Sequence, residues 1–168
     1  MTEGGIVKNK ITNGWRRMAL VSLLASGSAL ATDIKVSVTV IAPPHCTVNG
    51  GKAILVDFGT DLVTTRVNGN NYVKTVDYTL DCRGNSRNAM KMRVVGTATD
   101  FNRNALQTQQ SNLGIELRAN GQPLAINGWL NFTYPNAPTL QAVPVKRNNS
   151  VLNTGSFSAG ATLMVDYQ

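Results

Sequence analysis

The sequence predicts an all-β sandwich, and three observations lead to this prediction. Charged residues make up only 15% of the chain, whereas Gly, Asn, Thr and Ser are plentiful. No long segment with a 3.6-residue apolar period follows residue 31. Short runs of alternating apolar and polar residues are instead separated by Asn-Gly and Gly-Asn turns, which is typical of sandwich domains. A chain of 168 residues is long enough for one such domain with a sizeable core.

Residues 1–31 are predicted to be a secretory signal peptide. Four basic residues form its n-region: Lys8, Lys10, Arg16 and Arg17. The stretch from Met18 to Ala31 is apolar or small and ends in an A-x-A cleavage site. We expect cleavage to leave Thr32 as the first mature residue, with translation from Met18 as an alternative start. A membrane anchor is not expected, because a spanning helix needs about 20 apolar residues.

The formal net charge of +7 belongs partly to this signal. Without its four basic residues and Glu3, the rest of the chain keeps a mild positive excess. A mild excess does not indicate a nucleic-acid partner, so none is expected.

The only two cysteines, Cys46 and Cys82, lie beyond the predicted signal. An even pair in an oxidising compartment predicts a disulfide, with two buried free thiols as the alternative. Closing a loop of this length is worth about 3–4 kcal/mol in the chain-entropy model.

Periodicity predicts a series of strands at 32–42, 53–58, 72–82, 90–95, 113–118, 139–146 and 157–167. Pro43 and Pro44 end the first of them, because proline cannot donate to a ladder. Pro144 lies inside another, which predicts an edge strand or a bulge there. The polar residues 97–112 are expected to form a loop, and Asn120-Gly121 predicts a type I′ hairpin turn.

The last predicted strand has a regular period of two. Its apolar residues are Phe157, Ala159, Ala161, Leu163, Val165 and Tyr167. This spacing places them on one face of a half-buried strand. Such a strand needs partners on both edges, because otherwise a row of N–H and C=O groups stays unpaired.

These features resemble the subunits of bacterial chaperone–usher pili. Gly155 stands fourteen residues from the C-terminus and Tyr167 is the penultimate residue, as in that family's C-terminal signature. The segments 42–49, 54–59 and 143–145 and the position of the second cysteine also match. The resemblance covers residues 32–168 and points especially to the minor tip and adaptor subunits of P-type and type 1 pili. Two departures are the absence of Gly from residues 32–42 and the extra His45.

The resemblance implies an immunoglobulin-like sandwich that lacks its seventh strand. A periplasmic chaperone would fill the resulting groove first. At the outer-membrane usher, the N-terminal extension of the next subunit would replace the chaperone strand. Residues 32–42 would form the donor strand leading into the first core strand, with Ile34, Val36 and Val38 entering a neighbour's groove.

The acceptor groove and chaperone contact implied by the resemblance comprise Gly155, Phe157, Ala159, Ala161, Leu163, Val165, Tyr167 and Gln168. Basic chaperone residues would hold the terminal carboxylate of Gln168. The expected function is that of a structural subunit, exported through the periplasm to a cell-surface fimbrium and supporting cell adhesion. It would be a minor tip or adaptor subunit linking adhesin to pilus, with neighbouring subunits or the adhesin as partners.

Catalysis, metal binding and cofactors are not expected. His45 is the only histidine, so neither a His-based triad nor a His-rich metal site can be assembled from the sequence. The acids Asp57, Asp61, Asp77 and Asp81 are interpreted as solvated strand-end residues, with paired carboxylates for glycosidic chemistry as the alternative.

A second function class is a small secreted carbohydrate-binding adhesin with a sandwich fold. It would use Trp129, Phe132 and Tyr134 as a sugar-stacking platform, whereas our interpretation places these aromatic residues in the core. The basic residues Arg83, Arg87, Lys91 and Arg93 lack interleaved aromatic residues in the sequence and are interpreted as a solvated strand face.

Overall fold

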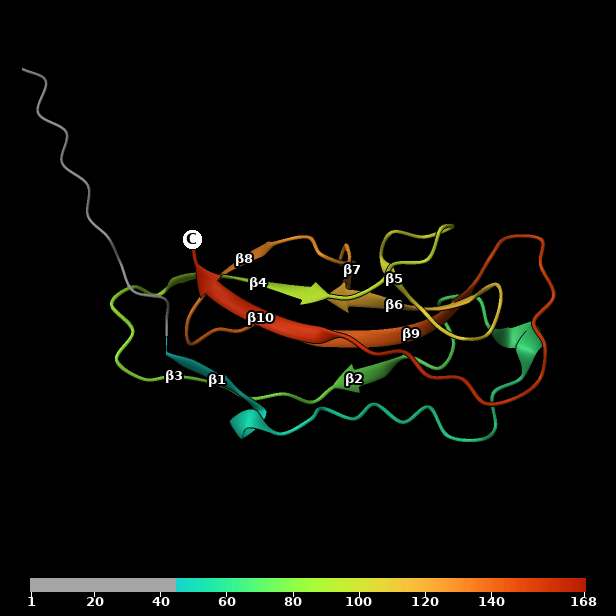
Figure 1. The fold of residues 1–168 in the computed structure, drawn as a ribbon, viewed down its shortest axis with the longest axis horizontal. Helices are drawn as coiled ribbons and strands as arrows, with labels where there is room; N and C mark the ends of the chain where they lie inside the picture. Colours follow the sequence, from blue (N-terminus) through green and yellow to red (C-terminus); the bar gives the residue numbers. More distant parts are fainter. Residues whose placement is uncertain (1–44) are drawn as a thin grey trace, which may run out of the picture. The chain divides into compact units, whose positions relative to one another are not determined.

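The computed structural model describes residues 45–168 and has an all-β fold (Figure 1). Its strands are β1 (Cys46–Val48), β2 (Lys74–Val76), β3 (Leu80–Cys82), β4 (Ala89–Val95), β5 (Ala105–Gln107), β6 (Leu113–Ala119), β7 (Gln122–Pro123), β8 (Leu130–Thr133), β9 (Leu140–Lys146) and β10 (Thr162–Tyr167). Two short 3₁₀ turns, η1 (Asn49–Gly51) and η2 (Thr64–Arg66), are the helical elements of this part of the chain. Within residues 45–168, no helix has the length and apolar character needed to cross a bilayer.

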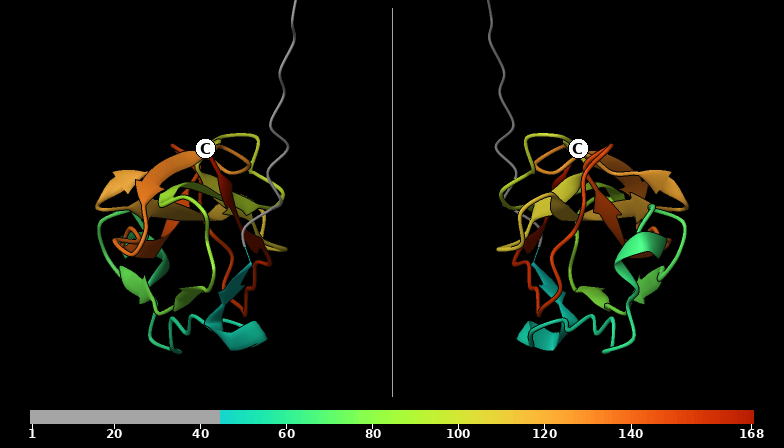
Figure 2. Two further views of the ribbon diagram at one scale, coloured as in Figure 1. Left: turned by 90° about the vertical axis from the view of Figure 1, so that its left-hand side faces the viewer. Right: turned by 90° about the vertical axis from the view of Figure 1, so that its right-hand side faces the viewer.

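The strands form three antiparallel groups. The largest sheet has the order β2-β9-β6-β5, with β7 also paired to β6, and the second has the order β10-β4-β8. Strands β1 and β3 form a separate pair. Viewed end-on, the strands surround a common interior (Figure 2). Apolar side chains of β4, β6 and β9 fill this interior, including Met90, Met92, Ile115, Leu117 and Leu140. The predicted sandwich is therefore confirmed.

The disulfide predicted from the cysteine pair is also confirmed. Cys46 of β1 lies directly opposite Cys82 of β3 in the ladder, and their Sγ atoms are bonded. Cys82 is buried in the main core cluster. The bond therefore ties the segment that follows residue 45 to the interior of the fold.

Pairing with other strands accounts for two elements that the periodicity did not predict. Residues 97–112 are not wholly a loop, because they contain β5, which pairs with β6. Ala105 and Leu106 of β5 are buried in spite of their polar neighbours. The aromatic stretch around residue 130 contains β8, which pairs with β4. Conversely, the predicted strand 72–82 is divided into β2 and β3, which join different sheets.

Pro144 lies at a position in the sheet where the ladder with β6 does not require an N–H group. The prediction of an edge strand or a bulge is wrong, since β9 lies between β2 and β6 and its register against β6 is uninterrupted. However, β2 pairs only as far as Ala142. Beyond its end, Gly69 N donates to Pro144 O at 3.2 Å. The nitrogen and oxygen of one strand residue face the same side, so Pro144 N also points away from β6 and no ladder bond to β6 is lost.

The turn at Asn120-Gly121 agrees with the predicted type I′ hairpin. The φ angles of the two residues are 51° and 77°, and this turn type requires positive φ at both positions. The turn connects β6 to β7, which pair in an antiparallel hairpin.

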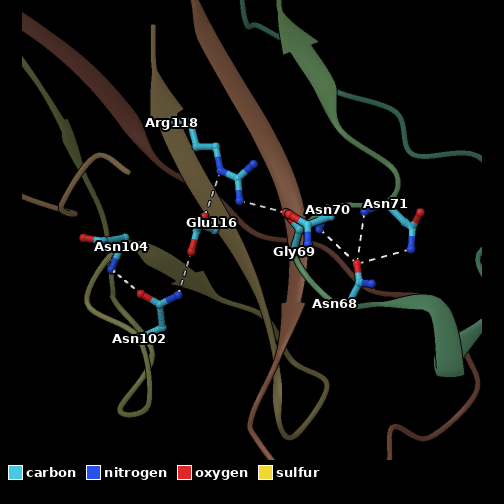
Figure 3. Close-up of polar contacts among 8 residues, drawn as sticks. All are labelled: Asn68, Gly69, Asn70, Asn71, Asn102, Asn104, Glu116 and Arg118. Atoms are coloured by element: carbon cyan, nitrogen blue, oxygen red, sulfur yellow. Dashed lines mark hydrogen bonds and ion pairs between the residues drawn. The ribbon is translucent and has the colours of Figure 1, made fainter. Parts of the chain in front are cut away.

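The outer face of β6 carries a polar network that fastens two loops to the large sheet (Figure 3). Glu116 is only 9% exposed, and its carboxylate accepts hydrogen bonds from Arg118 Nε and Asn102 Nδ2, both at 2.9 Å. Arg118 Nη2 also donates to Gly69 O at 2.7 Å. The buried carboxylate is thus fully partnered, which offsets the cost of its desolvation.

Two segments that alternate in sequence do not form strands. Residues 53–58 lie outside every ladder of the described chain, and the terminal strand begins at Thr162 rather than at Phe157. The physical reason is the same in both cases, because a strand requires a paired neighbour and none is present within residues 45–168. These two segments form the walls of the groove described below.

We predict that Cys82→Ser lowers the free energy of unfolding by about 3–4 kcal/mol, because the cross-link no longer restricts the unfolded chain. The yield of soluble chain recovered from an oxidising compartment should fall accordingly. The double variant Cys46→Ser/Cys82→Ser should behave like the single variant, and a reducing agent should lower the yield of the wild type only. Two alkylatable thiols in wild-type material recovered from that compartment would contradict the prediction.

Candidate functional site: an apolar groove beside the terminal strand

A groove of about 630 Å³ lies between residues 53–58 and the segment that leads into β10. Its floor consists of core residues from the two main sheets and the segments beside them: Val76, Val94, Leu106, Ile115, Leu117, Leu140 and Ala142. Most of these side chains also belong to the main core cluster. The groove is therefore an opening into the hydrophobic core.

The first wall is the extended segment 53–58. Ile54, Val56 and Phe58 are partly buried, while the residues between them are exposed, and Leu55 is 89% exposed. The backbone groups of residues 54–58 make no hydrogen bond to other parts of residues 45–168. This wall therefore has the side-chain alternation of a strand without the ladder that would define one.

The second wall includes residues 157–163, and the register of β10 fixes which way its backbone points. Gln168 N donates to Ala89 O at 3.2 Å, which shows that the even-numbered residues face β4. Successive residues of a strand point their N–H and C=O groups to opposite sides. The odd-numbered residues from 163 to 167 therefore direct theirs away from β4. No strand within residues 45–168 pairs with that edge of β10.

The residues predicted for this site fall into two groups. Phe157, Ala159, Ala161 and Leu163 line the groove together with Ser158 and Thr162. Phe157 also packs against Phe58 across the groove, with 5.9 Å between the ring centroids. Within this group, Ala159 and Ala161 are exposed, so nothing in the described chain covers them.

The other predicted residues lie beyond the two ends of the groove. Val165 and Tyr167 pack against the core, and the hydroxyl of Tyr167 accepts a hydrogen bond from Ser86 N at 3.0 Å. The side-chain amide of Gln168 donates to Met90 O at 2.8 Å and to Phe132 O at 3.2 Å. Gly155 lines an adjoining hollow beyond Phe157. The predicted donor residues Ile34, Val36 and Val38 lie outside the described residues.

Sequence reasoning did not identify the groove floor or its first wall. The floor residues come from strands far apart in the sequence, and each reads locally as an ordinary core residue. The first wall did carry a signal, because Ile54, Val56 and Phe58 alternate like a strand. That signal predicted a paired strand and not an exposed wall.

The aromatic residues proposed as a sugar platform do not share a surface. Phe132 is buried in the core and Tyr134 packs against it, whereas Trp129 is 42% exposed. Lys91 Nζ and Arg93 Cζ lie 4.9 Å and 4.5 Å from the centroid of the Trp129 ring. The pairing of β8 with β4 thus brings Trp129 over two cationic side chains of the basic cluster, although no aromatic residue is interleaved with them in the sequence.

Within the described part of the chain, no three His, Cys, Asp or Glu residues are close enough to hold a metal ion. His45 is exposed, and Asp81 forms an exposed ion pair with Arg83 at 2.8 Å.

Comparison with known proteins identifies relatives of the whole described fold. A family model described as fimbrial protein matches residues 34–168. The chain is 42% identical to the fimbrial-like protein YfcQ of Escherichia coli K12, over 90% of this chain and 99% of that protein. It is 28% identical to the fimbrial adapter PapF of Escherichia coli, over 90% of this chain and 98% of PapF. The solved structure of the P pilus adaptor subunit PapF matches with a TM-score of 0.55 and 25% identity, covering 76% of this chain and 98% of that one.

We predict that Ala161→Asp weakens binding of a peptide of residues 32–42 roughly tenfold or more, because the peptide would bury an unpaired charge. Ala161 is exposed and lines the groove, so the change should leave the rest of the fold intact. Met164→Asp is the matched control, since Met164 lies on the other face of β10 and is 41% exposed. Fluorescence anisotropy of labelled peptide measures both. Equal affinities for the two variants would show that the groove is not the binding site.

Proposed function

The chain belongs to the fimbrial protein family, and we propose that it is a minor tip or adaptor subunit that joins its neighbours by donor-strand exchange. Family membership confirms the prediction of a chaperone–usher pilus subunit with an immunoglobulin-like fold. Proteins of this family are structural subunits that contact other subunits in a cell-surface pilus. The proposal concerns how this chain makes those contacts and which place it takes.

The observation that carries the proposal is an open core between two unpaired backbone edges. An extended strand in the groove would form one ladder with residues 54–58 and another with the odd-numbered residues of the β10 wall. Its alternate side chains would cover the apolar floor. Main-chain bonds would then supply affinity and the side-chain pockets specificity, as in other cases of strand addition.

The donor strand of the proposal is the N-terminal extension of a neighbouring subunit. The corresponding extension of this chain carries Ile34, Val36 and Val38 at a period of two, a spacing that would suit a floor that accepts every second side chain. A peptide of residues 32–42 therefore serves as the model donor strand. Complete burial of an aliphatic side chain contributes about 1.5–3 kcal/mol. Three such side chains offset part of the cost of ordering an extended segment, and the main-chain hydrogen bonds of the two ladders contribute further.

Before assembly, the same groove would hold a strand from a periplasmic chaperone. An exposed apolar groove with free strand edges is an aggregation hazard, which gives the chaperone its physical role. Tyr167 and Gln168 are fixed by hydrogen bonds to the body of the fold, so the terminal carboxylate stands at a defined place. Basic chaperone residues could use it to set the register of pairing, because charge-assisted bonds are directional. The outer-membrane usher would be the place of exchange.

The adaptor role rests on the likeness to the fimbrial adapter PapF, which extends over nearly the full length of that protein. In this role the chain would link an adhesin to the pilus and so support cell adhesion. The carbohydrate-binding alternative has less support, since Trp129, Phe132 and Tyr134 do not form a common surface.

We predict that deletion of residues 32–38 abolishes donation of a strand to the neighbouring subunit and leaves acceptance of a strand intact. The truncated chain should still co-purify with the chaperone, because its own groove is intact, but it should be absent from sheared pili. Val36→Asp should reproduce the defect, since it would bury a charge in the neighbour's groove. Lys35→Asp is the matched control, because residue 35 would face outward. Immunoblots of pili that contain the truncated chain at the wild-type level would refute donation by this segment.

A further inference from the structure

The backbone of the β10 wall is supported beyond the point where its ladder ends. Pairing with β4 stops at Thr162, opposite Val95. Closer to Gly155, two side chains form hydrogen bonds to this segment in place of the ladder. Gln109 Oε1 accepts hydrogen bonds from Ser158 N at 2.9 Å and from Ser158 Oγ at 3.3 Å. Gln110 Nε2 donates to Ser156 O at 3.1 Å.

The residue numbers of the bonded backbone groups show that the two glutamines replace ladder partners. Residues 156 and 158 are even-numbered, as are the residues of β10 that face β4. An amide side chain offers the same acceptor oxygen and donor nitrogen as a peptide group. Gln109 and Gln110 therefore continue the β4 side of the ladder along the wall. If the chain between them is extended, the backbone groups of the intervening residue Phe157 face the groove side.

The loop that carries the two glutamines is itself held firmly. Thr108 is buried, and its Oγ1 donates to Leu113 O at 2.9 Å and accepts from Gln110 N at 3.1 Å. On the opposite side, Gly155 has a φ of 133°, and a Cβ placed there would lie 3.1 Å from Gln110 Nε2. A glycine thus provides both the backbone conformation and the room that the Gln110 amide needs.

We propose that Gln109 and Gln110 are positioning residues of the groove, which hold residues 156–158 extended so that Phe157 and Ala159 present their backbone groups to an incoming strand. The proposal rests on the proposed function and deepens it. Without these side chains, the wall between Gly155 and Thr162 has no fixed register. A bound strand then loses partners along this half of the groove and leaves sooner.

Replacing the amide by a carboxylate is expected to have opposite effects at the two positions. Gln109 acts as an acceptor, so Gln109→Glu keeps its bonds, whereas Gln109→Ala removes them. Gln110 acts as a donor, so Gln110→Glu loses its bond and opposes Ser156 O with a negative charge. Gln107→Glu adds the same charge at an exposed position two residues away from Gln109 and serves as the control.

The experiment measures dissociation of a labelled peptide of residues 32–42 from its preformed complex with the chain, after addition of excess unlabelled peptide. We expect Gln109→Ala and Gln110→Glu to dissociate about 3- to 10-fold faster than wild type, which corresponds to one or two lost hydrogen bonds. Gln109→Glu and Gln107→Glu should dissociate like wild type. Wild-type rates for both Gln109→Ala and Gln110→Glu would overturn the proposal, and so would equal rates for Gln109→Ala and Gln109→Glu.

Hydrogen exchange of the Ser158 amide in the preformed peptide complex gives a second readout, which does not depend on dissociation. Exchange should be faster in Gln109→Ala and unchanged in Gln109→Glu, whereas the amides of β4 should exchange equally in all variants. Unchanged protection of Ser158 in Gln109→Ala would overturn the positioning role. A wild-type chain that captures no peptide of residues 32–42 would instead refute the proposed function.

Discussion

The structure depends on one unmet requirement: a groove lined by apolar side chains stands open between two rows of backbone groups that have no ladder partners in the described chain. Buried peptide groups must be hydrogen-bonded, and apolar surface must be removed from water. A single extended strand in the groove would meet both requirements at once, because it would pair with residues 54–58 on one side and with the β10 wall on the other.

Several local features keep the groove open and in register. The disulfide between Cys46 and Cys82 anchors the start of the first wall to β3. At the other wall, β4 orders the chain from Thr162 onward, while Gln109 and Gln110 support the part before it. Phe157 stands opposite Phe58 and bounds the groove at this end. A groove prepared in this way loses less conformational entropy when a strand binds, which raises affinity without new contacts.

The sequence predicted the features that depend on residue types and their spacing, and did not predict those that depend on which strands pair. The cysteine pair, the Asn120-Gly121 turn and the alternation within β10 follow from residue types and their spacing. Strand β5 was predicted as loop, because its polar flanks hide a pairing with β6. The alternation from Phe157 onward predicted a strand, but only the part beside β4 has a partner. The groove floor could not be found at all, since it exists only after separate strands meet.

The central claim is that the chain needs one more strand to complete its fold, and a thermal melt tests it most directly. The chain of residues 32–168 is compared with the same chain carrying a second copy of residues 32–42 on its C-terminus through a flexible linker. Both are expressed without a chaperone. The account predicts a soluble monomer with a cooperative melt for the extended chain, and aggregation or a melt without cooperativity for the other. A stable monomer with a cooperative melt in the unextended chain would contradict it.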